Sequence, residues 1–512
     1  MVPKIASIGL FGLNAFPVKV EISVSQGVPD IIIGGLADRS VQESVMRIKA
    51  AMQNNGMKIG QMKCEINLSP SGVKKSGSGF DLAILTAVLA AAGYVPAGLD
   101  GKAFIGEVSL AGDICGIPGA LAMAIEAAQN GITELYLPAE NAAEASVVKN
   151  LRVFGVSSVA ELTGHLCGRK LLMPSKPEPP DADSLRSELD FADVRGQEAV
   201  KGAIEVAAAG FHNLLMIGPP GTGKSMIAKR IPTVLPKMSF EESIETTKIY
   251  SVAGMLSSES PLVTRRPFRN VSHTASGVGL IGGGSVPRPG EISLAHNGVL
   301  FLDEFPEFDR KVLETLRQPL ENGEITISRA AGAITYPCNI MLVAAMNPCP
   351  CGNYGSTVKR CTCTMQQVSK YLGKISQPIL DRIDIQTEVA SVSYDDLTGN
   401  GKSESSAAMA ERIAAAREVQ RERYKGTDIR SNSGITPDKL HDICVLDDKA
   451  EAYLKLAFEK AGLSARAYDR VLKVARTCAD LDGSEVIQKK HVARAVGYRS
   501  LDRKYWKNAL PL

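Results

Sequence analysis

Gly218-Pro219-Pro220-Gly221-Thr222-Gly223-Lys224-Ser225 is the stretch of sequence on which the fold of this chain depends. It has the pattern G-x-x-x-x-G-K-S, whose glycines let the backbone wrap a phosphate. The apolar run 214–217 before it predicts a buried strand, and residues 226–230 after it begin a helix that points N–H groups at the phosphate. We expect the whole stretch to bind ATP, with Lys224 reaching the β- and γ-phosphates and the Ser225 hydroxyl holding Mg²⁺. The alternative, a glycine-rich turn with a stray Lys-Ser pair, is disfavoured by the flanking strand and helix.

Two carboxylates and an amide follow further apolar runs. Residues 299–302 are apolar and end at Asp303 and Glu304. Ligands collect at the carboxyl ends of parallel strands, so we expect Asp303 to hold Mg²⁺ through water and Glu304 to polarise the attacking water. Asn347, after the apolar run 340–346, would lie between the two nucleotide-binding strands and help to place that water. An ordinary strand end is the alternative for Asp303 and Glu304.

Two arginines complete the predicted catalytic set. Arg382 lies between two acidic residues at a predicted helix end, and Arg466 opens a helix near the C-terminus. In this order of parts, Arg382 is typical of an arginine finger that reaches the γ-phosphate of a neighbouring subunit, although a surface ion pair is the alternative. We interpret Arg466 as a second sensor that closes a helical lid on the nucleotide.

Composition favours a cytoplasmic multidomain protein. At 512 residues, with 45% apolar and 22% charged residues, the chain suits about two to four globular domains. The apolar segment 81–99 is broken by Gly93 and Pro96, which predicts a buried helix rather than a membrane span. The ten cysteines and the lack of a convincing leader fit a reducing cytoplasm. The net charge of +3 permits a nucleic-acid partner but does not by itself indicate one.

The patterns predict a multidomain α/β fold in four segments. These are an α+β domain (1–170), a proline-rich linker (171–188), a parallel α/β ATPase core (189–395) and an all-α end (396–512). In the first segment we expect strands at 18–24, 30–35 and 64–70 and a helix at 41–54 that Ser40 caps. In the last segment we expect helices at 409–425, 447–461, 464–481 and 488–497, after a polar loop at 398–408.

The first segment resembles the Lon-protease-like domain, which has the fold of ribosomal S5 domain 2. The resemblance rests on Gly106-Glu107-Val108-Ser109-Leu110-Ala111-Gly112 and Tyr136-Leu137-Pro138-Ala139-Glu140-Asn141. A protease of this type needs a serine and a lysine, and by this resemblance those positions fall on Gly79 and Leu121. Ser76 or Ser78 could replace the serine, but residues 113–131 contain no lysine to activate it. We therefore expect no protease dyad.

Over nearly its whole length the chain resembles the magnesium-chelatase-like branch of the AAA+ ATPases, and within it the ComM/YifB family. The diagnostic stretches are 266–269, 279–284 and 287–298. The chain departs from the family at Val271-Ser272-His273, where Pro-His-His is usual, which puts a role for the first histidine in doubt. The resemblance implies a homo-oligomeric, hexameric ring, with DNA and recombination proteins as its partners.

The resemblance also implies two insertions that face the pore of the ring. We expect the first at 267–290 and the second as a β-hairpin at 324–336. Arg288 and Arg329 are the candidates for contacts with DNA phosphates. The alternative is that both are solvated or pair with a neighbouring subunit. No base-reading motif is present, so we expect binding that is insensitive to sequence.

Four cysteines follow Asn347 closely, as Cys349-Pro350-Cys351 and Cys361-Thr362-Cys363. The spacing is tighter than that of usual zinc sites, yet four thiolates are a typical ligand set for a structural Zn²⁺. Reduced thiols without a metal are the alternative, and disulfides are the least favoured state in a cytoplasmic protein.

Together these patterns predict a ring-forming, Mg²⁺-dependent ATP hydrolase. The resemblance implies a helicase that drives branch migration of recombination intermediates during DNA uptake and transformation. The alternatives are a chelatase-type motor and an ATP-dependent protein remodeller, each of which would act on a protein partner.

Overall fold

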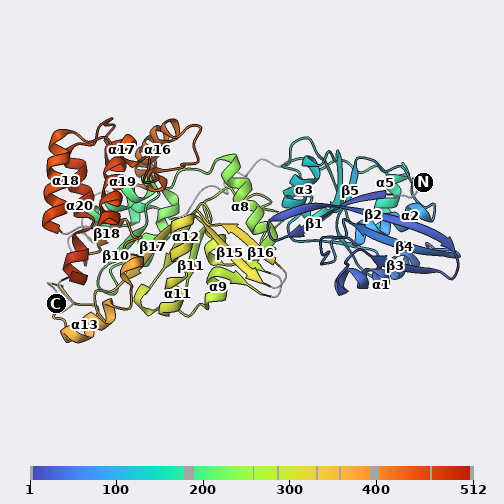
Figure 1. Ribbon diagram of the computed structural model, residues 1–512, viewed down its shortest axis with the longest axis horizontal. Coiled ribbons are helices and arrows are strands. Elements are labelled where there is room, and N and C mark those ends of the chain that lie inside the picture. The colour runs from blue at the N-terminus through green and yellow to red at the C-terminus, as the bar shows by residue number, and fades with distance from the viewer. Residues whose placement is uncertain are drawn as a thin grey trace.

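The computed structural model describes residues 4–177, 189–257, 259–284, 287–329, 332–356, 359–392, 403–461 and 464–507. Figure 1 shows two lobes along the long axis of the molecule. The N-terminal lobe contains a seven-stranded sheet, and the other lobe contains a five-stranded sheet with the C-terminal helices packed beside it. In the described parts, no helix has both the length and the apolar character needed to cross a membrane.

The N-terminal sheet has the strand order β3-β4-β2-β1-β5-β8-β9. Its strands are β1 (Lys4–Phe11), β2 (Asn14–Gln26), β3 (Asp30–Gly34), β4 (Met62–Ser69), β5 (Lys102–Phe104), β8 (Glu134–Pro138) and β9 (Arg152–Val156), and a separate pair is β6 (Glu107–Val108) and β7 (Ile114–Cys115). The helices are α1 (Arg39–Asn54), α2 (Asp81–Ala91), α3 (Ala120–Gln129), α4 (Ala142–Ala145) and α5 (Val159–Leu166). Helix α2 is apolar except for Asp81 and Thr86 and is almost completely buried, as the apolar segment 81–99 predicts.

The predicted cap of α1 is wrong. Asp38, rather than Ser40, precedes the helix, and its carboxylate accepts a hydrogen bond from the Val41 N–H at 3.0 Å. Ser40 lies inside the first turn, because Asp38 is the residue with the extended backbone that a cap requires.

The central sheet is parallel throughout, with the order β11-β14-β17-β10-β18. Its strands are β10 (Leu214–Ile217), β11 (Phe268–Val271), β14 (Val299–Leu302), β17 (Met341–Met346) and β18 (Ile385–Glu388). The helices around it are α6 (Glu198–Gly210), α7 (Lys224–Arg230), α8 (Phe240–Ala253), α9 (Gly277–Ile281), α10 (Glu291–Leu294), α11 (Arg310–Glu314), α12 (Arg317–Asn322), α13 (Met365–Leu372) and α14 (Gln377–Leu380). The inner strands are continuous apolar runs because both of their faces are covered.

The predicted start of the first insertion is wrong. Phe268–Val271 is not part of an insertion but forms β11, the edge strand of the central sheet, paired in parallel with β14. The strand was not predicted from the sequence, because it is an edge strand that is only partly buried and contains the polar residues Arg269 and Asn270. The insertion proper follows it and contains α9 and a short strand pair, β12 (Gly282–Gly283) and β13 (Arg288–Pro289).

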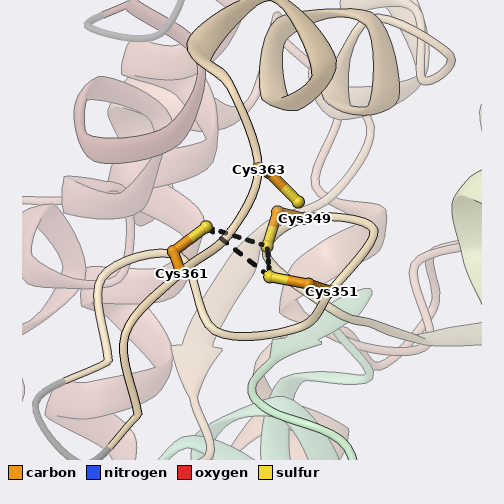
Figure 2. A group of neighbouring side chains, drawn as sticks. All are labelled: Cys349, Cys351, Cys361 and Cys363. Carbon is orange, nitrogen blue, oxygen red and sulfur yellow. Dashed lines mark hydrogen bonds between the residues drawn. The ribbon is translucent and has the colours of Figure 1, made fainter.

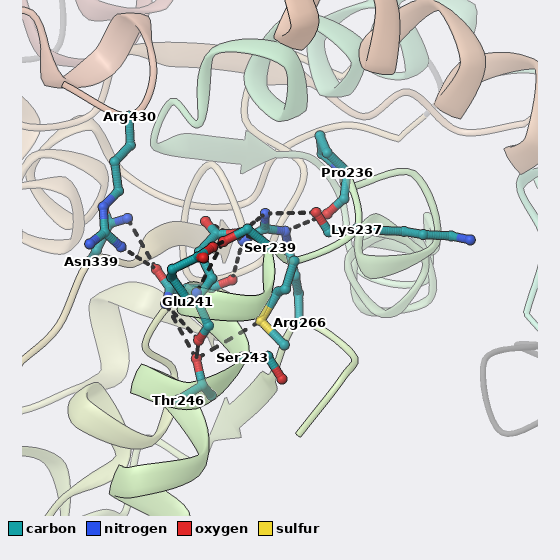
Figure 3. Close-up of polar contacts among 12 residues, drawn as sticks. Pro236, Lys237, Ser239, Glu241, Ser243, Thr246, Arg266, Asn339 and Arg430 are labelled. Atoms are coloured by element: carbon teal, nitrogen blue, oxygen red, sulfur yellow. Dashed lines mark hydrogen bonds and ion pairs between the residues drawn. The ribbon is translucent and has the colours of Figure 1, made fainter. Parts of the chain in front are cut away.

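Two arginines of the diagnostic stretch 266–269 fix this edge of the sheet. Arg266 donates to the carbonyl of Pro236 at 2.5 Å, to that of Asn297 at 2.8 Å and to Glu242 at 2.9 Å, which ties the start of α8 to the turn before β14. Figure 3 shows this network around the first turn of α8. Arg269 forms two hydrogen bonds with Glu291, at 2.6 and 2.8 Å, and so ties β11 to α10. A bidentate pair of this kind fixes orientation as well as distance.

The predicted hairpin at 324–336 is present as β15 (Glu324–Arg329) and β16 (Gly332–Pro337), whereas the turn residues 330 and 331 lie outside the described part. It contacts both neighbouring parts of the molecule. The Tyr336 hydroxyl donates to the Pro287 carbonyl at 2.9 Å, which joins the hairpin to the first insertion. From the N-terminal lobe, Leu13 in the β1–β2 turn packs into the same apolar core as Ile334.

The C-terminal end contains α16 (Ser406–Arg423), α17 (Leu440–Ile443), α18 (Asp448–Ala461), α19 (Ala465–Leu481) and α20 (Lys489–Gly497). Apart from the short α17, which was not predicted, these helices lie near the predicted bounds. Residues 398–402 of the polar loop predicted at 398–408 fall outside the described residues, and the prediction is wrong at the end of the loop, because α16 already begins at Ser406. Asp480 in α19 accepts hydrogen bonds from Arg423 at 2.6 Å and from Asn432 at 2.8 Å, so a buried carboxylate joins α16 to α19.

Candidate nucleotide-binding site

The loop between β10 and α7 has the backbone that a phosphate cradle needs. Gly221 and Gly223 have φ angles of 79° and 86°, in the left-handed region that favours glycine. Lys224, the first residue of α7, directs its ammonium back over the loop, to the carbonyls of Gly218 at 2.7 Å and Pro219 at 2.8 Å. It also donates to Asn347 Oδ1 at 3.2 Å, which brings the residue predicted to place the water next to the predicted phosphate ligand.

The two predicted Mg²⁺ ligands are also adjacent. The Ser225 hydroxyl donates to Asp303 Oδ2, and Asp303 Oδ1 accepts the Glu304 N–H at 2.9 Å. A hydroxyl beside a carboxylate is a donor set that suits Mg²⁺, an ion that prefers oxygen and keeps several waters. These two residues would hold the ion, which would neutralise the charge of the phosphates.

Glu304 differs from Asp303 in its backbone conformation, which is left-handed. Its φ is 51°, an uncommon angle for a residue that is not glycine, and its side chain remains largely exposed in the pocket. This left-handed turn directs successive carboxylates to different positions, so that Asp303 faces Ser225 and Glu304 reaches toward the edge strand.

His273 is a site residue for which the sequence predicted no role. Its Nδ1 lies 3.0 Å from Glu304 Oε2, just beyond the end of β11. The one signal in the sequence was that His273 belongs to Val271-Ser272-His273, where the family usually has Pro-His-His. The segment could not be located near Glu304 from the sequence, because β11, which pairs with β14, was not predicted.

These residues line one pocket of about 710 Å³ at the carboxyl edge of the sheet. Besides the phosphate-binding loop its lining contains Asp303, Glu304, His273 and Asn347. Burial lowers the pKa of Lys224 to about 8, although the charge of Asp303 acts in the opposite direction.

Arg382 and Arg466 do not line this pocket. They share a second pocket, of about 640 Å³, whose lining includes Asn213, Asn339 and Asp384, which lie one or two residues before β10, β17 and β18. The second pocket therefore lies at the opposite, amino edge of the same sheet. The prediction that Arg466 closes a lid over the nucleotide does not fit this chain's own phosphate-binding loop.

The lining of the second pocket combines cationic side chains with an equal number of carboxylates. Arg382 is almost fully buried, forms an ion pair with Glu321 and donates to the Pro378 carbonyl at 2.7 Å. The hydrogen bond from Arg382 lowers the pKa of Glu321, and the charge of the exposed Arg466 adds to this effect. The remaining cationic residues of the lining are Arg430, Arg470 and Lys473.

The family of this chain follows from its similarity to known proteins. Residues 190–397 match the family described as "Magnesium chelatase, subunit ChlI", and residues 403–499 match its C-terminal part. The chain is 41% identical over 499 residues to "Competence protein ComM" of Haemophilus influenzae and 40% identical over 494 residues to "Uncharacterized protein YifB" of Escherichia coli, and each match covers 96% of both chains. The chain belongs to the ComM/YifB family of magnesium-chelatase-like proteins. Its ATPase core is accordingly an AAA+ core.

In this ComM/YifB protein, residues 20–141 match a family described as "Subunit ChlI of Mg-chelatase". The resemblance of the N-terminal lobe to a Lon-type domain stays a prediction, since that description does not mention Lon. At the positions predicted for a dyad, Gly79 has no side chain and Leu121 is buried, while the Ser78 hydroxyl donates to Glu107.

The two candidate DNA-contacting arginines of this ComM/YifB protein lie on neighbouring elements. Arg288 is exposed and pairs with Gly283 across the β12–β13 ladder. Arg329 is exposed at the end of β15, and a side chain added at Gly283 would meet its guanidinium. Both arginines therefore lie beside Gly283, where the first insertion packs against the hairpin.

Proposed function

We propose that the protein is an ATP hydrolase that works as a ring, in which each subunit completes the nucleotide site of the next. The observation that carries this proposal is the separation of the predicted catalytic residues onto the two edges of one parallel sheet. Lys224, Asp303, Glu304 and Asn347 line the carboxyl-edge pocket, whereas Arg382 and Arg466 line the amino-edge pocket. A head-to-tail neighbour would bring the two pockets together, and such contacts close into rings. We expect a hexamer.

The residues of the first pocket support a mechanism of phosphoryl transfer to water. Lys224 and the loop N–H groups would bind the triphosphate, and Ser225 and Asp303 would hold Mg²⁺. Glu304 would accept a hydrogen bond from the attacking water, with Asn347 fixing the water from the neighbouring strand. Arg382 of the next subunit would stabilise the charge that develops on the γ-phosphate, after its ion pair with Glu321 opens.

We further propose that the substrate moved by the ring is branched DNA, and that the activity is branch migration of recombination intermediates. The name of the Haemophilus influenzae relative links that protein to competence, which supports a role in DNA uptake. Arg288 and Arg329 supply exposed positive charge where the two insertions meet, and such charge binds the DNA backbone without reading its sequence. The ring would act in the cytoplasm together with recombination proteins.

The test measures ATP hydrolysis with and without forked and four-way-junction DNA, together with strand exchange on the junction. We expect branched DNA to stimulate hydrolysis in the wild type, and Glu304→Gln to abolish junction processing while ATP binding persists. Glu307→Gln is the matched control, because Glu307 is an exposed carboxylate paired with Lys374 at 2.8 Å outside the pocket. Hydrolysis that no DNA structure changes would overturn the DNA assignment and leave the ATPase intact.

The family description favours one alternative. The subunit whose description the core matches belongs to a chelatase, so a motor that remodels a protein partner is the second candidate. In that case the N-terminal lobe would carry the partner, and the same ATPase assay would respond to a protein from cell extract rather than to DNA.

A further inference from the structure

The four clustered cysteines have the geometry of a tetrahedral metal site. Their sulfur atoms all lie within 4.8 Å of one another, with separations of 3.4 Å (Cys349–Cys351), 3.7 Å (Cys349–Cys361) and 3.6 Å (Cys351–Cys361). Zn–S bonds of about 2.3 Å in a tetrahedron place the sulfurs about 3.8 Å apart. The separations greatly exceed the length of a disulfide, about 2.05 Å. In Figure 2, Cys363 approaches the other three thiols from the start of α13.

The surroundings of the cluster also suit a structural ion. Cys349 is fully buried, and its sulfur accepts the Tyr354 N–H at 3.3 Å, the kind of hydrogen bond that supports a thiolate ligand. The described residues between β17 and α13 contain neither helix nor strand, so few backbone hydrogen bonds hold this connection. A metal ion bound by the cysteines at both ends of this connection would cross-link it where backbone hydrogen bonds are few.

The cluster is in direct contact with the nucleotide site. Cys349 lies two residues after Asn347, whose side chain accepts a hydrogen bond from Lys224. Gly352, between the first two cysteines and the second pair, has a φ of 79° and packs so closely on Pro220 that an added Cβ would lie 2.4 Å from the proline ring. A displacement of the cysteine loop toward Pro220 would therefore disturb the phosphate-binding loop, and a displacement of Cys349 would be transmitted to the nearby Asn347.

We propose that Cys349, Cys351, Cys361 and Cys363 bind one Zn²⁺ ion, and that this ion holds the loop against Pro220 and fixes Asn347 for nucleotide binding. The ion lies outside the nucleotide pocket and takes no part in hydrolysis. It is a structural support, whose loss lowers the affinity for ATP by releasing the loop.

The first test measures the metal content of the full-length protein by mass spectrometry. We expect one zinc per chain in the wild type, and less than a tenth of that in Cys361→Ser/Cys363→Ser. The matched control is Cys115→Ser/Cys167→Ser, because these half-buried cysteines lie in the N-terminal lobe, and it should keep its zinc. Wild-type protein without zinc, and without the visible bands of a cobalt tetrathiolate after exchange with Co²⁺, would overturn the site.

Because the double variant could fail to fold, Cys363→His provides a second variant. Imidazole is a good zinc ligand, so Cys363→His should keep the ion, whereas Cys363→Ser should bind it more weakly. Equal zinc affinity in both variants would mean that Cys363 is not a ligand.

The second test asks whether zinc binding affects the affinity for ATP. Binding of a fluorescent ATP analogue, measured before and after removal of zinc by a chelator, should weaken at least tenfold and recover when Zn²⁺ is returned. Unchanged affinity would overturn the coupling but not the metal site. Neither readout depends on DNA or on ring formation, so failure here is distinct from failure of the proposed function.

Discussion

Lys224 is a buried cation whose charge depends on pH in a range open to experiment. Burial lowers its pKa to about 8. A bound triphosphate requires the protonated ammonium, so affinity is highest below this pKa and falls as pH rises through it. We expect the Kd for ATP to be constant near pH 7 and to rise up to about tenfold per pH unit above about pH 8.

Lys224→Arg is the control for this pH dependence, because a guanidinium stays charged throughout the range. The variant should bind ATP more weakly but with a Kd that does not change between about pH 7 and about pH 9.5. Isothermal titration calorimetry across this range is the measurement. A wild-type Kd that is flat to the upper limit would contradict the assignment of Lys224.

His273 is a positioning residue in our interpretation, since its imidazole reaches Glu304 rather than the phosphate-binding loop. We expect His273→Ala to lower kcat about ten- to a hundredfold with little change in KM, because Glu304 would lose its orientation. His273→Asn, which retains a donor, should recover part of the loss. Steady-state ATPase kinetics that show a changed KM at constant kcat would point to a role in substrate binding instead.

At the scale of elements, the buried Asp480 decides how α16 and α19 pack. Its carboxylate is fully buried and is surrounded by donors from Arg423, Arg476 and Asn432. Asp480→Ala would leave the buried Arg476 and the partly buried Arg423 without their carboxylate partner, so we expect a loss of about 3–5 kcal/mol in unfolding free energy. Urea unfolding followed by the fluorescence of Trp506, the chain's single tryptophan and a buried side chain, is the measurement.

Glu422 is the matched control for Asp480. It lies in α16 next to Arg423, is exposed and pairs with the exposed Lys425 at 3.8 Å. Glu422→Ala should cost no more than about 1 kcal/mol, because solvent screens such a pair. Similar losses in both variants would mean that burial of Asp480 is not what stabilises the helical end.

At the scale of the whole molecule, the two pockets predict complementation between subunits. Lys224→Ala and Arg382→Ala should each be nearly inactive alone. When they are mixed, an Arg382→Ala subunit keeps an intact carboxyl-edge pocket, and in the proposed ring a Lys224→Ala neighbour would supply the arginine. Random assembly should restore roughly a quarter of the wild-type ATPase rate.

The control for complementation mixes Lys224→Ala with Glu304→Gln. Both changes lie in the same pocket, so every subunit carries a damaged site and no rescue is expected. Rescue in this control, or its absence in the test mixture, would contradict the division of the site between subunits.

Most elements of the fold could be predicted from local sequence patterns, and the predictions that were wrong have identifiable physical causes. The phosphate-binding loop, β14, β17, the hairpin and the long C-terminal helices depend on contiguous residues, so periodicity and glycine placement predicted them. Strand β11 was missed because an edge strand need not be apolar, and His273 was missed with it. The helix cap at Asp38 differs from the predicted Ser40 because adjacent polar residues compete for that position.

The sequence by itself determined the chemistry of this protein: a phosphate-binding loop, a paired Asp303 and Glu304, two arginines and four close thiols. Only the tertiary structure decided where these groups lie relative to one another. It put Arg382 and Arg466 at the edge of the sheet opposite Lys224, and it packed the cysteine loop on Pro220. The physical reason is that chemical identity and local propensity belong to the residue and its neighbours, whereas distance across a sheet depends on the order in which distant strands pair.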